Sequence, residues 1–99
     1  MDRQFHFYMH LLTPVGEDHD DLGAMFADIG AAYLDVAAAM PDTAAELLRR
    51  GIDPMACAYR ICDEHGRRLM DVPFAELVRR EGRGDMAVME PVGYAKRGL

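Results

Sequence analysis

The chain contains no serine, no asparagine and no tryptophan, and only two threonines, Thr13 and Thr43. Its only thiols are Cys57 and Cys62. Nucleophilic catalysis needs a hydroxyl or thiol beside a base that a third group orients. None of these four residues lies in a recognisable motif of that kind, so we predict that the protein is not an enzyme.

Other absences exclude further classes of protein. The single lysine is Lys96, so the phosphate-binding loop, which ends in Gly-Lys-Ser/Thr, is missing. No apolar run approaches the ~20 residues that a membrane-spanning helix needs, and the start of the chain lacks the organisation of a signal peptide. We therefore expect a cytoplasmic protein without a cofactor, whose cysteines stay reduced.

What the chain does contain is typical of one small domain. It has 99 residues, of which 51% are hydrophobic, and a formal net charge of −6 at pH 7. This hydrophobic content favours folding over disorder. The negative charge disfavours binding to nucleic acids and to anionic membranes. We assign residues 1–80 to a single domain and residues 81–99 to a linker and tail, in which residues 86–92 could add a strand.

Residues 4–12 alternate between apolar and polar side chains, which predicts a half-buried strand. The face expected in the core carries Phe5, Phe7, Met9 and Leu11, and the other face carries Gln4, His6, Tyr8 and His10. A turn at residues 13–16 and an acidic loop at residues 17–21 follow. Either a helix or a short strand at residues 24–26 could come next.

Asp28 is a suitable N-cap for a long helix. After it, apolar residues recur at intervals of three or four, as on one face of a helix: Ile29, Tyr33, Val36, Met40, Ala44 and Leu47. Pro41 interrupts the helix while the spacing keeps its phase, so one kinked helix and two separate helices are both possible. Residues 43–46 resemble a capping box for a second start, and Gly51 is a natural stop.

The next segment predicts a hairpin followed by a helix. Residues 55–63 and 67–72 read as strands, joined by a turn in which Gly66 permits a positive φ. Pro73 suits the first position of a short helix that ends near Arg80. Together the elements predict an α+β fold, in which a small, mostly antiparallel sheet of ββαββ type packs against one long kinked helix, with a short C-terminal helix.

Several short motifs resemble a known family, the DUF6894 family of short bacterial proteins common in rhizobia and related alphaproteobacteria. The matching segments are FHFYMHL from Phe5, DDLG from Asp20, DIxxAY from Asp28, GxDP from Gly51 and CDEHGRRLMDVPFAE from Cys62. The resemblance covers roughly residues 4–78. It implies a ββαββ-like arrangement and a strand at residues 24–26, and it implies no activity.

Two stretches could supply metal ligands. His6, Tyr8 and His10 share one strand face, but four residues of strand span about 13 Å, whereas zinc–nitrogen bonds are about 2 Å. The two histidines therefore cannot hold the same ion by themselves. The acidic loop offers oxygen ligands without the spacing of an EF-hand. The candidate metal ligands are His6, His10, Asp18, His19 and Asp20. The structural alternative is a polar sheet face and an ordinary acidic loop.

Two further patterns have structural explanations. Cys57, Cys62 and His65 have a spacing that resembles part of a zinc site, but the two cysteines point to opposite faces of a strand. Arginines come in pairs at residues 49–50, 67–68 and 79–80. They are expected at helix ends and on exposed strands, and would bind nucleic acid only if the fold placed them on one surface.

Two classes of function remain. We predict a non-enzymatic binding or regulatory module that acts as a homodimer through a sheet edge or an apolar surface. The eight methionines suit an adaptable apolar contact. The alternative is a metal- or small-ligand-binding protein, or an enzyme, that uses the His6/Tyr8/His10 face or the acidic loop at residues 17–21.

Overall fold

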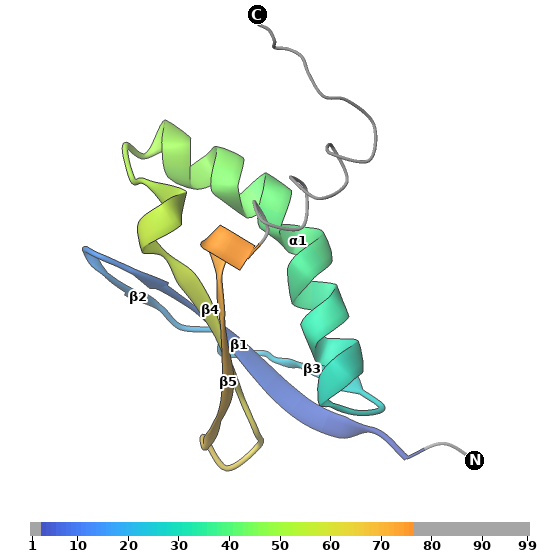
Figure 1. Cartoon of the computed structure of the whole chain (residues 1–99). Helices are drawn as coiled ribbons and strands as arrows, with labels where there is room; N and C mark the ends of the chain where they lie inside the picture. The colour runs from blue at the N-terminus through green and yellow to red at the C-terminus, as the bar shows by residue number, and fades with distance from the viewer. Residues whose placement is uncertain (1–2, 77–99) are drawn as a thin grey trace, which may run out of the picture.

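A computed structural model describes residues 3–76 of the chain. In them one long helix lies against an antiparallel sheet of five strands, which confirms the predicted α+β class (Figure 1). The elements in chain order are β1 (Phe5–Thr13), β2 (Gly16–Asp18), β3 (Ala24–Phe26), α1 (Ile29–Arg49), the 3₁₀ helix η1 (Pro54–Ala56), β4 (Ala58–Cys62) and β5 (Arg68–Pro73). No helix within this part of the chain is long and apolar enough to cross a bilayer.

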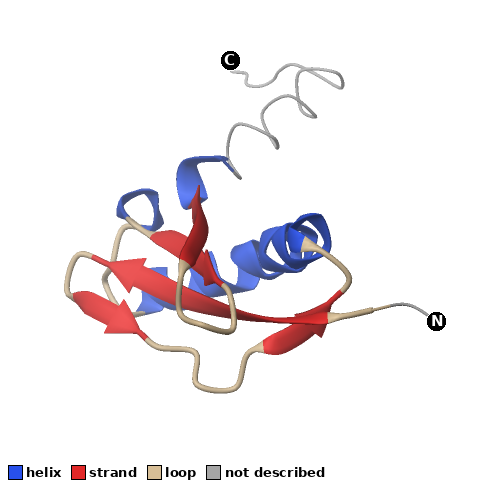
Figure 2. Ribbon diagram, turned by 90° about the horizontal axis from the view of Figure 1, so that it is seen from below, coloured by secondary structure: helices blue, strands red, loops and turns tan. Residues whose placement is uncertain are grey.

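β1 is the centre of the sheet, because it pairs with three other strands. On one edge it pairs with β4, which pairs in turn with β5. On the other edge β3 pairs with residues 5–7 and β2 with residues 11–13, so these two short strands follow one another along β1 (Figure 2). The strand that the family resemblance implies at residues 24–26 is confirmed as β3. The sequence analysis assigns residues 16–18 to a turn and an acidic loop, and this assignment is wrong because they form β2.

α1 is a single helix that continues through Pro41 and changes direction near its middle (Figure 1). The proline therefore bends one helix and does not separate two. Thr43 lies inside this helix, where its Oγ1 donates to the carbonyl oxygen of Ala39 at 3.1 Å and lies 2.8 Å from the Tyr59 hydroxyl on β4. Of the two alternatives, the structure has the single kinked helix, and Thr43 does not start a second one because its hydroxyl bonds the preceding turn and the sheet.

Both ends of α1 are capped as predicted. At the start, Asp28 Oδ1 accepts a first-turn N–H at 2.8 Å. At the end, Gly51 adopts a φ of 79°. Its N–H donates to the Leu48 carbonyl at 3.0 Å, and the Ile52 N–H donates to the Leu47 carbonyl at 2.9 Å. These two bonds form a Schellman motif, which stops the helix and turns the chain back towards the sheet.

One 3₁₀ turn, η1, precedes β4. Asp53 caps this turn by accepting the Met55 N–H at 3.0 Å, and Pro54 is its first residue. The sequence places the start of the strand at Met55, whereas β4 begins at Ala58. The prediction is wrong at this end because an Asp-Pro pair favours a capped helical turn over an extended segment.

The β4–β5 hairpin closes through the predicted turn. Asp63 Oδ1 accepts the N–H groups of His65 and Arg67, both at 2.9 Å. Gly66 has a φ of 82°, a conformation that a residue with a side chain rarely adopts. The pairing also contains an irregularity beside Cys62, where β5 has an extra residue. This bulge increases the local twist of the hairpin.

The chain turns into a helix directly after β5. Pro73 is the last residue of β5, and residues 74–76 are helical. The helix therefore starts one residue later than predicted. Its predicted end near Arg80, the tail and the potential strand at residues 86–92 lie outside the described residues.

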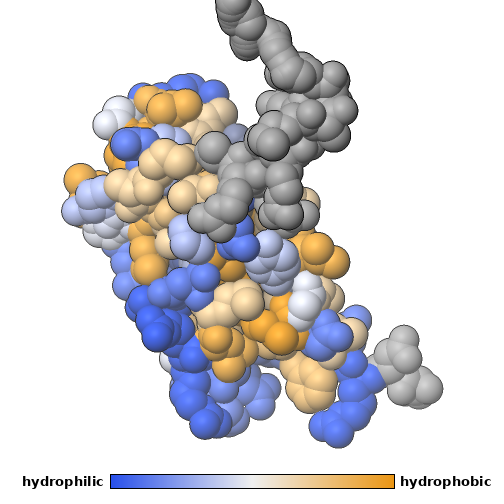
Figure 3. Space-filling model, viewed as in Figure 1, coloured by the Kyte–Doolittle hydropathy of each residue, from blue (hydrophilic) through white to orange (hydrophobic). Residues whose placement is uncertain are grey.

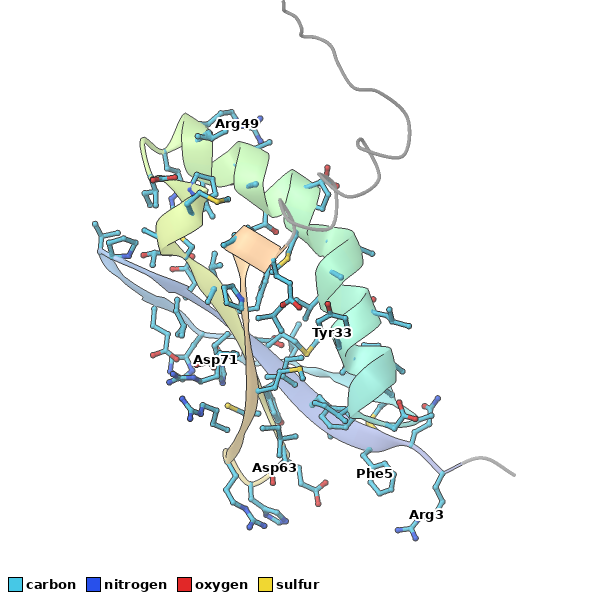
Figure 4. The ribbon with its side chains drawn as sticks, in the orientation of Figure 1. Arg3, Phe5, Tyr33, Arg49, Asp63 and Asp71 are labelled. Carbon is cyan, nitrogen blue, oxygen red and sulfur yellow. The ribbon has the colours of Figure 1, made fainter. Side chains whose placement is uncertain are left out.

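The core lies between α1 and one face of the sheet. All six residues of the apolar helix stripe belong to it, either buried or packed against buried neighbours. The buried core residues on the strands are Phe7, Ile61 and Val72, and Cys57 and Phe74 lie in the core just outside the strands. Phe5 is an exception to the predicted core face, because it is 44% exposed and the Arg3 guanidinium lies over its ring at 5.3 Å (Figure 4).

Gly23 allows the chain entering β3 to approach β1 closely. Its φ is 65°, in the left-handed region. A Cβ atom at this position would lie 2.6 Å from the Phe7 carbonyl oxygen and 2.6 Å from His6 Nε2. Glycine is therefore required at position 23 both by the backbone angle and by the lack of space for a side chain.

We predict that Gly23→Ala lowers the free energy of unfolding by about 3 kcal/mol, because a left-handed φ and a steric clash add together. Gly51→Ala is the matched control, since Gly51 also has a positive φ but a Cβ there would meet no atom within 4 Å. The Gly51→Ala variant should lose only about 1–2 kcal/mol of the free energy of unfolding. Urea unfolding followed by circular dichroism measures both values. Equal losses in the two variants would contradict the close approach at Gly23.

Candidate functional site

The sheet face that points away from α1 carries a row of stacked rings. We call it the outer face; its residues include His6, Tyr8, His10, Arg60, Cys62 and Asp71. The His6 and Tyr8 rings lie 4.7 Å apart at an interplanar angle of 15°, and the Tyr8 and His10 rings lie 6.5 Å apart at 13°. No helix of the described chain covers this face (Figure 2). It is the polar strand face that the alternation in β1 predicts.

The connection between β2 and β3 folds over one margin of the ring row. The Asp20 N–H donates to His10 Nδ1 at 3.1 Å, and His6 Nε2 donates to the Leu22 carbonyl oxygen at 2.8 Å. The His19 ring lies 4.4 Å from the His10 ring. As a result His10 is only 9% exposed. The chain itself therefore covers part of this polar face.

The Asp20 carboxylate organises this connection. Its Oδ2 accepts the Met9 N–H at 3.0 Å. Met9 lies between the part of β1 that pairs with β3 and the part that pairs with β2. The other oxygen, Oδ1, accepts the N–H groups of Leu22 at 3.2 Å and Gly23 at 3.0 Å. The carboxylate thus replaces the missing partner strand at one position of β1.

These hydrogen bonds also determine the charge of Asp20. Partial burial acts to raise the pKa of its carboxyl group. The N–H groups of Met9, Gly23 and Leu22, together with nearby His10, outweigh burial and hold this pKa below its ordinary value. Asp20 is therefore an ionised structural residue whose two oxygens are both engaged by backbone N–H groups.

The structure brings together two of the five candidate metal ligands, His10 and His19, and adds Glu17. One ligand atom from each of these three residues lies within 4.8 Å of the others. The remaining candidates have other partners. His6 bonds Leu22, Asp20 bonds the backbone, and Asp18 is paired with Arg50 at 3.4 Å.

The register of β1 and β2 explains this grouping. Leu11 is opposite Asp18 and Leu12 is opposite Glu17, so the same register places His10 opposite His19. Side chains alternate between the two faces of a strand. Glu17 and His19 therefore share the outer face with His10, whereas Asp18 points to the other face. Sequence reasoning includes Glu17 only as part of the acidic loop at residues 17–21 and does not place it beside His10, because it did not predict β2.

Ion pairs occupy another part of the outer face. Arg60 Nε and Nη2 donate to the two oxygens of Asp71 at 2.9 and 3.2 Å, and Arg68 Nη1 donates to Asp71 at 3.3 Å. The hydrogen bonds from Arg60 hold the pKa of Asp71 below its ordinary value, against the effect of partial burial. Figure 4 labels Asp71 on β5.

Every arginine between residues 49 and 68 is paired with a carboxylate. The pairs are Arg49–Glu46, Arg50–Asp18, Arg60–Asp71, Arg67–Asp63 and Arg68–Asp71. The first two lie at the end of α1 and the others at the β4–β5 hairpin, whose hydrophilic residues gather at the bottom of Figure 3. These arginines therefore form no continuous basic surface. Arg79 and Arg80 lie outside the described residues.

The threonine hydroxyls and cysteine thiols have structural positions. Thr13 Oγ1 donates to the Gly16 carbonyl at 2.7 Å in the β1–β2 turn, and Thr43 is bonded inside α1 and to the sheet. Cys57 and Cys62 are buried free thiols, and burial raises the pKa of both. A raised pKa keeps a thiol protonated and poorly nucleophilic.

Cys57, Cys62 and His65, whose spacing resembles part of a zinc site, do not come together in the structure. Cys57 belongs to the core cluster, whereas Cys62 lies on the outer face opposite Tyr8. His65 is exposed in the hairpin turn, where its Nε2 lies 3.5 Å from Glu64 Oε2. The two thiols cannot share an ion, because they point to opposite sides of the sheet.

Comparison with family models finds a match over residues 5–75 to the family described as Domain of unknown function (DUF6894). The matched region begins with β1 and ends just after β5, so it includes every element named above. No match was found among curated proteins or among solved structures. Function therefore has to be inferred from the residues of this chain.

We predict that Asp20→Asn lowers the free energy of unfolding at pH 7 by about 1–2 kcal/mol, because an amide nitrogen cannot accept the N–H groups that a carboxylate oxygen accepts. The folded-state pKa lies below the unfolded value, so the stabilisation is complete above about pH 4 and disappears as the pH falls through the folded pKa. The variant should therefore lose less stability than the wild type on acidification. Urea unfolding at a series of pH values measures the difference.

Asp21→Asn is the control for this measurement, since Asp21 is the exposed neighbour in the same connection. It should follow the wild-type pH dependence. Asp63 and Asp71 also have lowered pKa values, and they contribute equally to the pH dependence of stability in the wild type and both variants. An Asp20→Asn curve parallel to the Asp21→Asn curve would contradict the structural role of Asp20.

Proposed function

Because the chain belongs to the DUF6894 family, for which no function is described, we propose its role from its own geometry. We propose a non-enzymatic binding module that acts as a homodimer through the outer face of the sheet. The observation that carries this proposal is the row of rings formed by His6, Tyr8 and His10 on a face that no described helix covers. Flat rings on a regular sheet present a rigid contact surface with little conformational entropy to lose.

The burial, hydrogen bonding and pKa values of the thiols, hydroxyls and carboxyl groups support binding over catalysis. The cysteine thiols are buried with raised pKa values, and both threonine hydroxyls are hydrogen-bonded. The carboxyl groups with lowered pKa values, those of Asp20, Asp63 and Asp71, bond backbone N–H groups or arginine. A general acid at neutral pH needs a raised pKa instead. We place the protein in the cytoplasm, whose reducing conditions suit two free thiols.

The edges of the sheet are less suited to self-association than its outer face. β2 and β3 have only three residues each. The free edge of β5 carries a bulge, the charged Arg68 and a terminal Pro73. Short edge strands, bulges, charges and prolines all discourage pairing with another strand. For this reason we place the contact on the face.

Charge favours a second copy of this chain as the partner on that face. The chain as a whole carries −6, so two copies repel one another over most orientations. On the outer face Arg60 and Arg68 balance Glu17 and Asp71. A second copy can approach this neutral face without the repulsion that it meets elsewhere.

We predict that light scattering at roughly 50 µM gives the mass of a dimer, and that Tyr8→Glu weakens dimerisation by about 30-fold or more. The glutamate places an unpaired charge in the middle of the contact, where its desolvation is unfavourable. Circular dichroism and thermal melting establish that the variant remains folded.

Leu48→Glu is the matched control. Leu48 is 64% exposed on α1, away from the outer face, so the same added charge there should leave the dimer intact. A wild-type monomer at this concentration would refute the homodimer. A dimer that is insensitive to Tyr8→Glu, or equally sensitive to Leu48→Glu, would place the contact elsewhere.

A further inference from the structure

Three side chains with metal-binding atoms meet at the margin of the outer face, where β2 runs beside β1. We propose that His10, Glu17 and His19 form a site for a divalent transition-metal ion, with Zn²⁺ as the ion that suits it best. Their ligand atoms all lie within 4.8 Å of one another. The site shares His10 with the ring row of the proposed homodimer, but zinc binding and the mass of the dimer are measured separately, so either proposal can fail alone.

The spacing of the ligand atoms agrees with a tetrahedral ion. His19 Nε2 lies 3.5 Å from Glu17 Oε2. Bonds of about 2.0–2.2 Å at tetrahedral angles place two ligand atoms about 3.4 Å apart. His10 reaches the same point from the opposite strand, and its ring centroid is 4.4 Å from that of His19. The three ligand atoms lie within 4.8 Å of one another, so the exposed side chains of His19 and Glu17 have to rotate to bring all of them to bonding distance.

The ligand types select the class of ion. Two imidazoles and one carboxylate suit Zn²⁺, Co²⁺, Ni²⁺ or Cu²⁺, whereas Ca²⁺ and Mg²⁺ prefer sites made of oxygen alone. Three protein ligands leave a fourth position for water or for an incoming ligand. Zn²⁺ has no geometric preference of its own from its d electrons and commonly binds imidazole and carboxylate ligands in a four-coordinate site.

The site is both held in place and accessible. His10 is 9% exposed and is fixed between the Tyr8 ring and the Asp20 N–H. The side chains of His19 and Glu17 are 65% and 40% exposed, so an ion can reach them from solvent. One buried and two exposed ligands allow an ion to bind without unfolding of the hairpin.

Metal binding should be coupled to the connection between β2 and β3. His10 Nδ1 accepts the Asp20 N–H, so the neutral ring carries its proton on Nε2. An ion bound to Nε2 moves this proton to Nδ1, where it opposes the Asp20 N–H. An ion bound to Nδ1 displaces that N–H directly. In either case the Asp20 N–H loses its acceptor, and the connection has to shift.

The test is isothermal titration calorimetry of the untagged chain with zinc chloride. One ion per chain should bind, and His19→Ala and Glu17→Gln should each weaken binding by about tenfold or more. Both residues are exposed, so both variants should fold. In ¹H–¹⁵N spectra the Asp20 amide resonance should shift when zinc binds. Co²⁺ in place of zinc should give tetrahedral absorption bands without a thiolate charge-transfer band.

His65→Ala is the matched control. His65 Nε2 lies 3.5 Å from Glu64 Oε2, the same separation as in the His19–Glu17 pair, and among the described residues no third ligand joins it. This variant should bind zinc like the wild type. No saturable binding up to about 1 mM zinc, equal loss in His65→Ala and His19→Ala, or a thiolate band from Cys57 or Cys62 would overturn the proposal.

Discussion

The central strand β1 has to satisfy its backbone groups along one edge with two strands that are each too short for the task. β3 pairs with residues 5–7 and β2 with residues 11–13, which leaves Met9 between them. The Asp20 carboxylate accepts the Met9 N–H, and its second oxygen holds the turn that starts β3. An unpaired backbone N–H in this position would be unfavourable. One carboxylate thus joins two short strands into a single continuous edge.

The motifs that carry the family resemblance have a common structural explanation. Asp20 and Gly23 form the connection to β3, and Asp28 caps α1. The segment that begins at Gly51 stops the helix and starts η1, and the segment from Asp63 to Gly66 closes the hairpin. All of these residues determine how the chain turns. These turn motifs therefore encode the fold, and of the three residues of the proposed metal site only His10 lies in a matching segment, the one that begins at Phe5.

Sequence patterns predict the elements that depend on periodicity. The stripe from Ile29 to Leu47 identifies α1 because a helix needs one apolar face, and every residue of the stripe reaches the core. β2 has the sequence Gly-Glu-Asp, which shows no alternation, and only its pairing with β1 makes it a strand. The grouping of His10, Glu17 and His19 depends on that pairing. It could not be predicted, because it follows from register and not from spacing along the chain.

The connection between β2 and β3 also limits how the length of this chain can change. Asp20 has to reach Met9 while Gly23, three positions later, touches Phe7. One inserted or deleted residue between them would separate these two contacts. The hydrogen bonds of the turn at Val15 and Gly16 are local ones to Thr13, while Val15 is 77% exposed and a Cβ on Gly16 would meet nothing within 4 Å. Related chains should therefore differ in length at the β1–β2 turn and keep the following connection constant.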